Sequence, residues 1–300
     1  MIEIAEIKEG DIVARRSYNA DILFKVKYFF WDGEGKKQAS LKGIHMRLCA
    51  SAPVEDLIKI EPAELASYLR EQAKKSSEHL NRIFTRRTRE REILLGRAIK
   101  WTEGALKNNF KVEGFDVPGT VLHIDGDGDY LDLCLTTYKQ LGIPAEGYCI
   151  DEDRQPAAVE ELLKKHSPDL LVLTGHDGFI RGKKDFRDIN NYYNSRHFVE
   201  AVRAARRYEK SKDDLVIFAG ACQSHYEALL AAGANFASSP QRIMIHAYDP
   251  VFVVEKIAYT SIYDPVSIKD IIGSTITGFD GIGGMETRGK YRLGIPKSPY

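Results

Sequence analysis

The sequence has no long apolar run. No stretch of about 18 apolar residues occurs in its 300 positions, so no membrane-spanning helix is predicted. Residues 1–12 lack the apolar core of a secretory leader. The chain also lacks a net charge, because 43 Lys and Arg residues balance 43 Asp and Glu residues. That balance favours neither nucleic acid nor an anionic membrane as a partner of the whole chain.

Cysteine is scarce as well. The four cysteines include no C-x-x-C pair and no cysteine–histidine spacing typical of zinc sites; they are Cys49, Cys134, Cys149 and Cys222. These absences exclude a disulfide scaffold and a zinc finger. We therefore expect a cytoplasmic protein whose cysteines are free thiols and which needs no metal or organic cofactor.

The composition itself is that of an ordinary globular protein, 43% hydrophobic and 29% charged, long enough for one large domain or two smaller ones. Residues 1–62 are predicted to form a small β module. Segment 12–30 is rich in Val, Ile, Phe and Tyr, a Gly-containing turn follows at 32–35, and strand-like residues return at 39–48 and 57–60. Short strands joined by tight turns fit a small SH3-like β-barrel, although other small β modules fit the same pattern.

Residues 63–116 are predicted to form a basic helical linker, because 63–108 contains no proline and is rich in Ala, Leu, Glu, Lys and Arg. Between Arg70 and Lys100 there are ten basic and four acidic residues, an excess of 10 − 4 = 6. A solvated helix is favoured over a nucleic-acid patch, because no aromatic platform beyond Phe84 interleaves with these charges.

Residues 117–300 are predicted to form an α/β domain with a doubly wound, mostly parallel sheet, because strand-like and helical runs alternate there. The predicted strands are 121–125, 146–150, 169–175 and 214–221, and the predicted helices lie near 129–141, 156–166, 196–209 and 224–232. The two central strands are continuous apolar runs, as expected when helices cover both faces of a sheet. Sheets of this kind bind ligands outside the carboxyl ends of their strands.

Two of these strands end in reactive residues. LLVLTG leads to His176, and LVIFAGA leads to Cys222. The spacing of 222 − 176 = 46 residues fits one crossover, so we expect the strands to be parallel neighbours and both side chains to emerge at one edge of the sheet. A free thiol has a pKa of about 8.5, and a neighbouring imidazole can take its proton. The pattern therefore favours Cys222 as a nucleophile and His176 as its general base.

The surroundings of Cys222 support this pairing. A helix is predicted to begin near Ser224, and the positive end of its dipole would favour a thiolate. The amides of Cys222 and of the residues after His176 could face a developing oxyanion. The competing interpretation is a structural cysteine, because cysteine is commonly buried. Two matched strand ends, each with a reactive residue, reduce the weight of that interpretation.

The segments around the two residues resemble a known family. The caspase pattern Q-A-C-[RQG]-G has its histidine about 50 residues upstream, and residues 221–224 (ACQS) match its middle, with Ser in place of the final Gly. TGHD (174–177), FAGACQSH (218–225) and GANFASSP (233–240) are similar to the YabG family of sporulation-specific proteases of endospore-forming bacteria. Further matching segments, which extend the resemblance over nearly the whole chain, are GDIVARRSYNADILFKV (10–26), VLHIDGDGDYL (121–131) and GGMETRG (283–289).

The resemblance implies a caspase-like cysteine peptidase with its dyad at His176 and Cys222. It also implies spore-coat and other spore-assembly proteins as substrates, cleavage in the mother cell, and a tendency to self-process. The wider clan has Gly directly after its catalytic His, whereas this chain has Asp177 and then Gly178. The oxyanion amide on that side is therefore expected from either Asp177 or Gly178.

The acidic loop 125–129 (DGDGD) follows the first strand of the α/β domain at the same predicted edge. One interpretation is a turn with Asp129 as a helix N-cap. The other is that Asp125 or Asp127 receives the P1 side chain of a substrate. The planar fork of arginine matches a carboxylate, so cleavage after Arg is the favoured specificity. A calcium loop is disfavoured, because the downstream Glu of an EF-hand is missing.

Two further expectations follow from the peptidase interpretation. Ser238 and Ser239 fall where the clan's next strand borders the specificity pocket, so their backbone is expected to line it. If the enzyme cuts after Arg, the run Arg86–Arg91, taken as exposed, is a candidate site of self-cleavage between the two domains.

The other histidines and cysteines receive lesser roles. His225, three residues after Cys222, is a weaker candidate base, because a base on a neighbouring strand's loop approaches the nucleophile more freely. It is interpreted instead as a polar residue of the first helical turn. The residues interpreted as structural are His123, His197, His246, Cys134 and Cys149, the last two being expected to be buried and inert, and Cys49 lies outside the α/β domain.

Two other classes of function stay open. An amidotransferase-like cysteine hydrolase usually carries G-x-C-x-G at its nucleophile, and residues 220–224 (GACQS) lack the final Gly. A non-catalytic spore adaptor would use the β module to bind a partner and the α/β domain as a scaffold.

Overall fold

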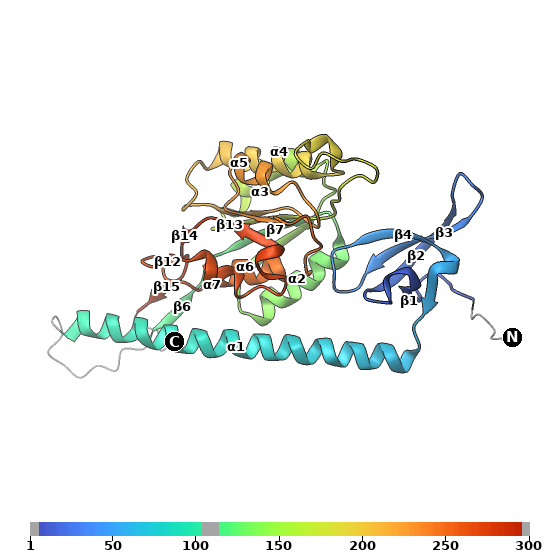
Figure 1. Ribbon diagram of the computed structural model, residues 1–300. Coiled ribbons are helices and arrows are strands. Elements are labelled where there is room, and N and C mark those ends of the chain that lie inside the picture. Colours follow the sequence, from blue (N-terminus) through green and yellow to red (C-terminus); the bar gives the residue numbers. More distant parts are fainter. Residues whose placement is uncertain (1–5, 104–113, 296–300) are drawn as a thin grey trace.

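The computed structural model describes residues 6–103 and 114–295. One long helix, α1 (Pro62–Glu103), connects two sheets and runs beneath the larger, α/β part of the molecule (Figure 1). The first sheet, which we call the β module, is antiparallel in the order β4-β3-β2-β1-β5. Its elements are β1 (Ile12–Arg15), η1 (Arg16–Tyr18), β2 (Leu23–Trp31), β3 (Lys37–Gly43), β4 (Cys49–Pro53), η2 (Val54–Asp56) and β5 (Leu57–Lys59).

Alternating apolar side chains and one tight turn build the β module. The predicted turn between β2 and β3 is confirmed: the Asp32 carboxylate accepts hydrogen bonds from the amides of Glu34 and Lys36, both at 2.9 Å, and Gly35 has a φ of +75°. The buried cluster of this sheet includes Val13, Phe24, Val26, Leu41 and Ala52.

The second sheet has six strands in the order β13-β11-β10-β9-β7-β8. Five of them run parallel, and β13 is antiparallel to β11. The strands are β7 (Val121–Asp125), β8 (Ala145–Cys149), β9 (Leu170–Thr174), β10 (Val216–Ala219), β11 (Phe236–Ser238) and β13 (Ile282–Gly284). The prediction of a mostly parallel sheet is confirmed, and each predicted strand lies within two residues of an observed one.

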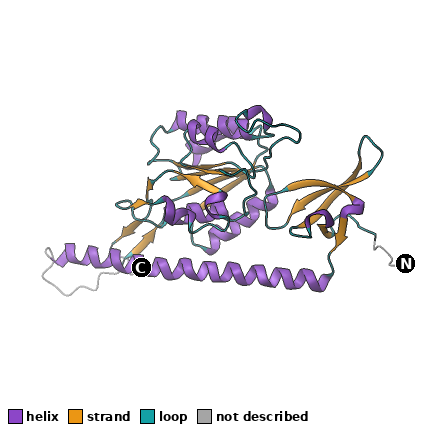
Figure 2. Ribbon diagram, viewed as in Figure 1, coloured by secondary structure: helices purple, strands orange, loops and turns teal. Residues whose placement is uncertain are grey.

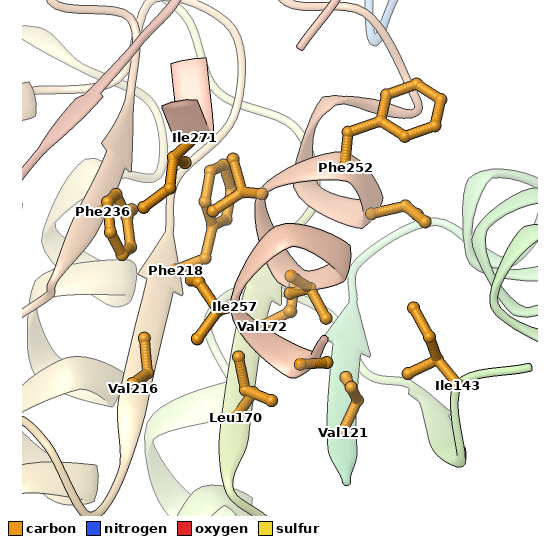
Figure 3. Close-up of a cluster of buried hydrophobic side chains, with 14 of the residues drawn as sticks. Val121, Ile143, Leu170, Val172, Val216, Phe218, Phe236, Phe252, Ile257 and Ile271 are labelled. Carbon is orange, nitrogen blue, oxygen red and sulfur yellow. The ribbon is translucent and has the colours of Figure 1, made fainter. Parts of the chain in front are cut away.

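Helices cover both faces of this sheet, as Figure 2 shows. The helices are α2 (Gly128–Gln140), α3 (Gln155–His166), α4 (Ser195–Tyr208), α5 (Tyr226–Ala232), α6 (Asp249–Ala258) and α7 (Ile268–Ile272). Leu122, Leu171 and Ile217 pack in one cluster with residues of α3, α4 and α5. The intervening side chains point to the opposite face, where Figure 3 shows Leu170 and Val172 near Ile257 of α6. Because both faces are buried, the central strands are apolar without interruption.

Short elements complete the fold. β6 (Phe115–Val117) pairs with β15 (Arg292–Gly294), and β12 (Pro265–Val266) pairs with β14 (Thr287–Arg288), so the end of the described chain returns to the start of the α/β domain. Two 3-10 turns are η3 (Ile189–Asn191) and η4 (Gly278–Asp280). In the described part of the chain, no helix combines the length and the hydropathy needed to cross a bilayer.

Helix α1 is docked on the α/β domain rather than being a solvated linker. Arg86 and Arg87 both reach the fully buried carboxylate of Glu255 in α6, at 2.5 and 2.6 Å, and Arg91 pairs with Asp116 at 2.9 Å. The expectation that the run Arg86–Arg91 is exposed is therefore wrong for Arg86 and Arg87, which hold the helix in place, whereas Thr88 and Arg89 are exposed as expected. Cleavage there would require this part of α1 to leave the domain and unfold.

We expect Glu255→Ala to lower the free energy of unfolding by about 2–3 kcal/mol. Removing one partner of a fully buried ion pair costs about 3–5 kcal/mol, and the arginines here stay partly hydrated, since 26% of the Arg86 side chain is exposed. Urea denaturation monitored by circular dichroism measures the change. Glu200→Ala, on the exposed face of α4, is the control and should shift stability by less than about 0.5 kcal/mol. Equal stabilities of the two variants would contradict the role given to Glu255.

Candidate active site

Two neighbouring strands carry the candidate dyad. β9 and β10 are parallel and adjacent, with Leu170 opposite Val216, which confirms the predicted adjacency. His176 follows β9 by two residues, and Cys222 follows β10 by three. Both residues therefore leave the sheet at its carboxyl edge. The strand order reverses between β7 and β9, so the position at which such sheets bind ligands lies beside these two residues.

Two glycines allow the chain to pack closely at this edge. A Cβ at Gly175 would lie 2.3 Å from Oε1 of Glu152, so no other residue fits without displacing that carboxylate. Gly220 has a φ of +105°, and a Cβ there would lie 2.5 Å from Oγ of Ser238. The loops that carry His176 and Cys222 therefore depend on glycine at these positions.

The imidazole of His176 lies between two carboxylates. Its Nε2 is 3.3 Å from Oδ2 of Asp127, and its Nδ1 is 3.7 Å from Oε1 of Glu152. The His176 amide donates to the same Glu152 oxygen at 2.6 Å. Burial alone lowers the pKa of His176, but contacts with the Cys49 thiol and with Glu152, and the nearby charge of Asp127, raise that pKa to about 10. The ring is therefore protonated at neutral pH.

The Cys222 side chain is almost fully buried, with 1% of its surface exposed. Its Sγ accepts a hydrogen bond from the Ile245 amide at 3.3 Å. Burial raises the pKa of the thiol to about 12, although the hydrogen bond from Ile245 acts in the opposite direction. The helix α5 begins at Tyr226 and is capped by His225, within two residues of the expected start near Ser224. The expected lowering of the thiol pKa does not occur in this conformation.

His176 and Cys222 are thus held by separate partners. Within the described residues, no hydrogen bond or ion pair joins their side chains. Tyr130 of α2 lies beside His176, with their ring centroids 5.9 Å apart, and burial raises the pKa of its hydroxyl. A protonated imidazole and a protonated, buried thiol describe a resting site rather than one ready to react.

Asp177 anchors the loop that follows His176. Its carboxylate accepts hydrogen bonds from the amides of Gly178 and Asn194 and from the hydroxyl of Ser224, each at 2.8 Å. Burial raises the pKa of Asp177 despite these bonds. The Gly178 amide, one of the two candidate oxyanion donors, therefore already donates to the Asp177 carboxylate. The Asp177 amide is the other candidate.

The first aspartate of the acidic loop is deeply buried. Asp125 has no exposed surface, and its Oδ2 accepts from Arg47 Nη1 at 2.7 Å and from the Thr174 hydroxyl at 2.8 Å. Burial would raise the pKa of Asp125, but the charge of Arg47 and the hydrogen bond with His123 hold it well below its usual range. This candidate P1 acceptor is therefore occupied by an arginine of the β module.

The second candidate acceptor, Asp127, is also engaged. Its Oδ1 accepts from the amides of Asp129 and Tyr130 and from Lys42 Nζ at 2.5 Å. Asp127 is thus the N-cap of α2, and the prediction that Asp129 is the cap is wrong by two residues. Among the described residues, no group of three or more His, Cys, Asp or Glu side chains is arranged to hold a metal ion.

Ser238 and Ser239 support the Cys222 loop from within. The Ser238 hydroxyl donates to the Ala221 carbonyl at 2.6 Å. The Ser239 hydroxyl accepts from the Gln223 amide at 2.9 Å and donates to the Ile243 carbonyl at 2.6 Å. Both serines are fully buried, so in this conformation their side chains hold the loop and do not reach solvent.

The secondary candidates have structural contacts. His225 caps α5 by accepting from the Ala228 amide, and its Nε2 donates to the Arg187 carbonyl. His123 and Cys134 are buried as predicted, whereas the prediction that Cys149 is buried is wrong. Cys149 is the last residue of the edge strand β8 and faces solvent there.

Three residues of the site were not found from sequence. Glu152 follows β8 at the carboxyl edge of the sheet, so its position after a predicted strand was the one available signal. Arg47 and Cys49 come from the β module, 78 or more residues before their partners, and no local pattern marks them. They reach the site because the β module docks against α2 at this edge, which Figure 1 shows.

The raised pKa of His176 predicts a dependence of stability on pH. A group whose pKa is higher in the folded state stabilises the protein fully below its unfolded pKa of about 6.5, and this stabilisation is lost as pH rises toward the folded value of about 10. The advantage in melting temperature of the wild type over His176→Gln should therefore shrink between pH 6.5 and 10. The same series on His197→Gln, on α4, is the control. A constant difference for His176→Gln would contradict the raised pKa.

The described site and fold can now be compared with known proteins. The model of a family described as YabG peptidase U57 matches residues 8–296, which places the chain in a class of peptidases. The Sporulation-specific protease YabG of Bacillus subtilis (strain 168) is 40% identical over 289 residues, covering 96% of this chain and 97% of that protein. The chain belongs to the YabG family of sporulation-specific proteases, and the resemblance seen in the sequence is confirmed.

Proposed function

We propose that the protein is a cysteine endopeptidase in which Cys222 is the nucleophile and His176 the general base. The observation that carries the proposal is the adjacency of β9 and β10, whose carboxyl ends lead directly to these two residues. Membership of a peptidase family supports it. Glu152, bound to the His176 amide and close to its Nδ1, is the residue proposed to orient the imidazole.

The proposed reaction proceeds in two stages. His176 takes the proton of the Cys222 thiol, and the sulfur forms a bond to the carbonyl carbon of the scissile peptide. The amides of Cys222 and Asp177 stabilise the oxyanion. The carbon–nitrogen bond then breaks as His176 gives its proton to the leaving amine. Water, deprotonated by His176, releases the acyl group as a carboxylic acid and restores the thiol.

This reaction requires a change from the resting arrangement. The His176 ring must turn from Asp127 and Cys49 toward Cys222 and release its proton to solvent, and the thiol must leave its hydrogen bond with the Ile245 amide. A substrate strand beside Ile245 could supply this change, because it would compete for the same backbone groups.

The fold of the α/β domain supports a caspase-like assignment. Numbered from β7, its six strands lie in the order 2-1-3-4-5-6, with the last antiparallel. The β module has five short antiparallel strands in the order β4-β3-β2-β1-β5, and this arrangement supports the SH3-like assignment. We keep residues 1–62, 63–116 and 117–300 as the proposed module, linker and peptidase domain.

The proposed substrates are spore-coat and spore-assembly proteins in the mother cell of a sporulating bacterium, cut after arginine. The support is the name of the Bacillus subtilis relative and the buried carboxylate of Asp125 at the substrate edge. Self-processing is also proposed, within the run Arg86–Arg91 once this part of α1 has left the domain. The experiment that tests the catalytic proposal compares Cys222→Ala with Cys49→Ser, because Cys49 also touches His176. Loss of cleavage in the second variant alone would assign the nucleophile to Cys49.

A further inference from the structure

The loop between β3 and β4, residues 44–48, lies along the segment that holds the candidate nucleophile. We call it the docking loop. Its backbone pairs with residues 245–247: the Ala247 amide donates to the His45 carbonyl at 3.0 Å, and the Arg47 amide donates to the Ile245 carbonyl at 3.3 Å. Met46 and His246 form an antiparallel bridge. Because the Ile245 amide binds Cys222 Sγ, the docking loop pairs directly with the segment that supports the nucleophile.

The side chain of Arg47 fills a pocket that is suited to a guanidinium. Its Nη1 donates to Asp125 at 2.7 Å, its Nη2 to Cys134 Sγ at 3.4 Å, and its guanidinium carbon lies 5.1 Å from the centre of the Tyr130 ring. Arg47 and Asp125 have no exposed side-chain surface. Without Arg47, the pocket would hold an uncompensated carboxylate facing an aromatic ring, which are the groups that bind arginine side chains.

Other residues of the β module engage the remaining groups of the site. Lys42 pairs with Asp127, and Cys49 lies against the His176 imidazole. The Tyr130 hydroxyl lies 2.7 Å from the carbonyl oxygens of both Gly43 and Met46 and shares its one proton between them, which holds the start of the docking loop against α2. The β module therefore contacts the candidate base and both candidate P1 acceptors at once.

We propose that the docking loop is an internal occupant of the substrate site, with Arg47 in the pocket that takes the arginine of a substrate. The enzyme is then self-blocked, and it acts only when the docking loop leaves. The inference rests on the proposed function, since it assigns the arginine pocket of that site to Asp125.

Self-blocking has a measurable consequence. An occupant on the same chain competes with any external ligand of the arginine pocket. The apparent association constant of that ligand equals its intrinsic value multiplied by the fraction of molecules in which the pocket is free. If the docking loop is bound in about 90–99% of molecules, emptying the pocket tightens external binding by about 10- to 100-fold. If Arg47 had only a structural role, its removal would disorder the pocket and would not tighten the binding of an external ligand.

The test measures binding of p-aminobenzamidine, an aromatic amidinium whose fluorescence rises in an apolar site. The full chain carries Cys222→Ala so that no cleavage occurs. Adding Arg47→Ala should tighten binding by about 10-fold or more, and the control Arg15→Ala should leave it unchanged. Arg15 belongs to the same module and pairs with Asp56 at 3.0 Å, so it matches the change in charge. Equal binding by the folded Arg47→Ala chain and the Arg15→Ala chain would overturn the inference.

A second measurement covers the case in which Arg47→Ala does not fold. With Arg47 intact, rising p-aminobenzamidine should speed hydrogen exchange at residues 44–48, because the probe and the docking loop exclude each other. Unchanged exchange at every concentration rejects the inference.

The outcomes also separate this inference from the proposed function. A chain that cleaves arginyl peptides through Cys222, but binds the probe equally with and without Arg47, rejects only the self-blocking. A chain that binds the probe more tightly after Arg47→Ala, yet cleaves nothing in any form, keeps the pocket assignment and rejects the dyad.

Discussion

Cys222→Ala is expected to lower the rate of peptide cleavage by about 1,000-fold or more while the chain stays folded. Removing the nucleophile of a covalent mechanism leaves only substrate binding and oxyanion stabilisation, so most of the catalysis disappears. The site tolerates the change, because the Cys222 side chain packs against apolar neighbours and alanine leaves a small gap there. The measurement is the initial rate on a fluorogenic arginyl peptide, with circular dichroism as the check on folding.

Cys49→Ser is the matched control for this result. It changes a second cysteine that contacts the same imidazole, but one that lies at the start of β4 and is exposed. If Cys49 only helps to hold the resting His176, its replacement should keep the rate or raise it. An unaltered rate in Cys222→Ala, together with an inactive Cys49→Ser, would transfer the nucleophile to the β module and reject the proposed dyad.

The sheet and the placement of the dyad could be predicted because the determining signals are local. The apolar runs that become β9 and β10 are long enough to mark buried parallel strands, and the crossover length made them neighbours. In a parallel sheet, adjacency alone brings the residues after both strands to one edge. The positions of His176 and Cys222 therefore followed from the pattern, although their side-chain contacts did not.

The electrostatics of the site depend on contacts that the sequence pattern does not reveal. The pKa of Cys222 was expected to fall because of the next helix, but burial raises it. Asp125 was expected to face a substrate, and it meets Arg47 from 78 positions earlier in the chain. A run of arginines on α1 looked like a solvated surface, whereas its partner Glu255 is buried in α6. Each of these differences arises from one element docking on another.

Asp125→Asn is expected to abolish the preference for arginine over citrulline at P1. Citrulline has the shape of arginine without its charge, so the ratio of kcat/KM for the two peptides isolates recognition of the charge. Truncating one partner of a buried, hydrogen-bonded charge pair costs about 2–5 kcal/mol, which is about 30-fold or more in that ratio. Asparagine keeps the size of Asp125, and its Oδ1 can still accept from Arg47 Nη1 and the Thr174 hydroxyl. Its NH2 group then replaces the oxygen that accepts from the Asp127 amide at 2.9 Å, so circular dichroism is needed to check that the variant stays folded.

Asp127→Asn supplies the comparison that makes this result specific. Asp127 is on the same acidic loop and also binds a cation of the β module, Lys42, but its Oδ1 caps α2. Its replacement releases one contact of the resting His176 imidazole, which it faces at 3.3 Å, and should leave the arginine-to-citrulline ratio within about threefold of the wild type. A ratio that collapses in Asp127→Asn and survives in Asp125→Asn would place the arginine pocket at Asp127. In that case Arg47 would not occupy the substrate pocket, because it binds Asp125 and not the carboxylate that selects the substrate. The Arg47–Asp125 pair would then be only a structural contact between the two domains.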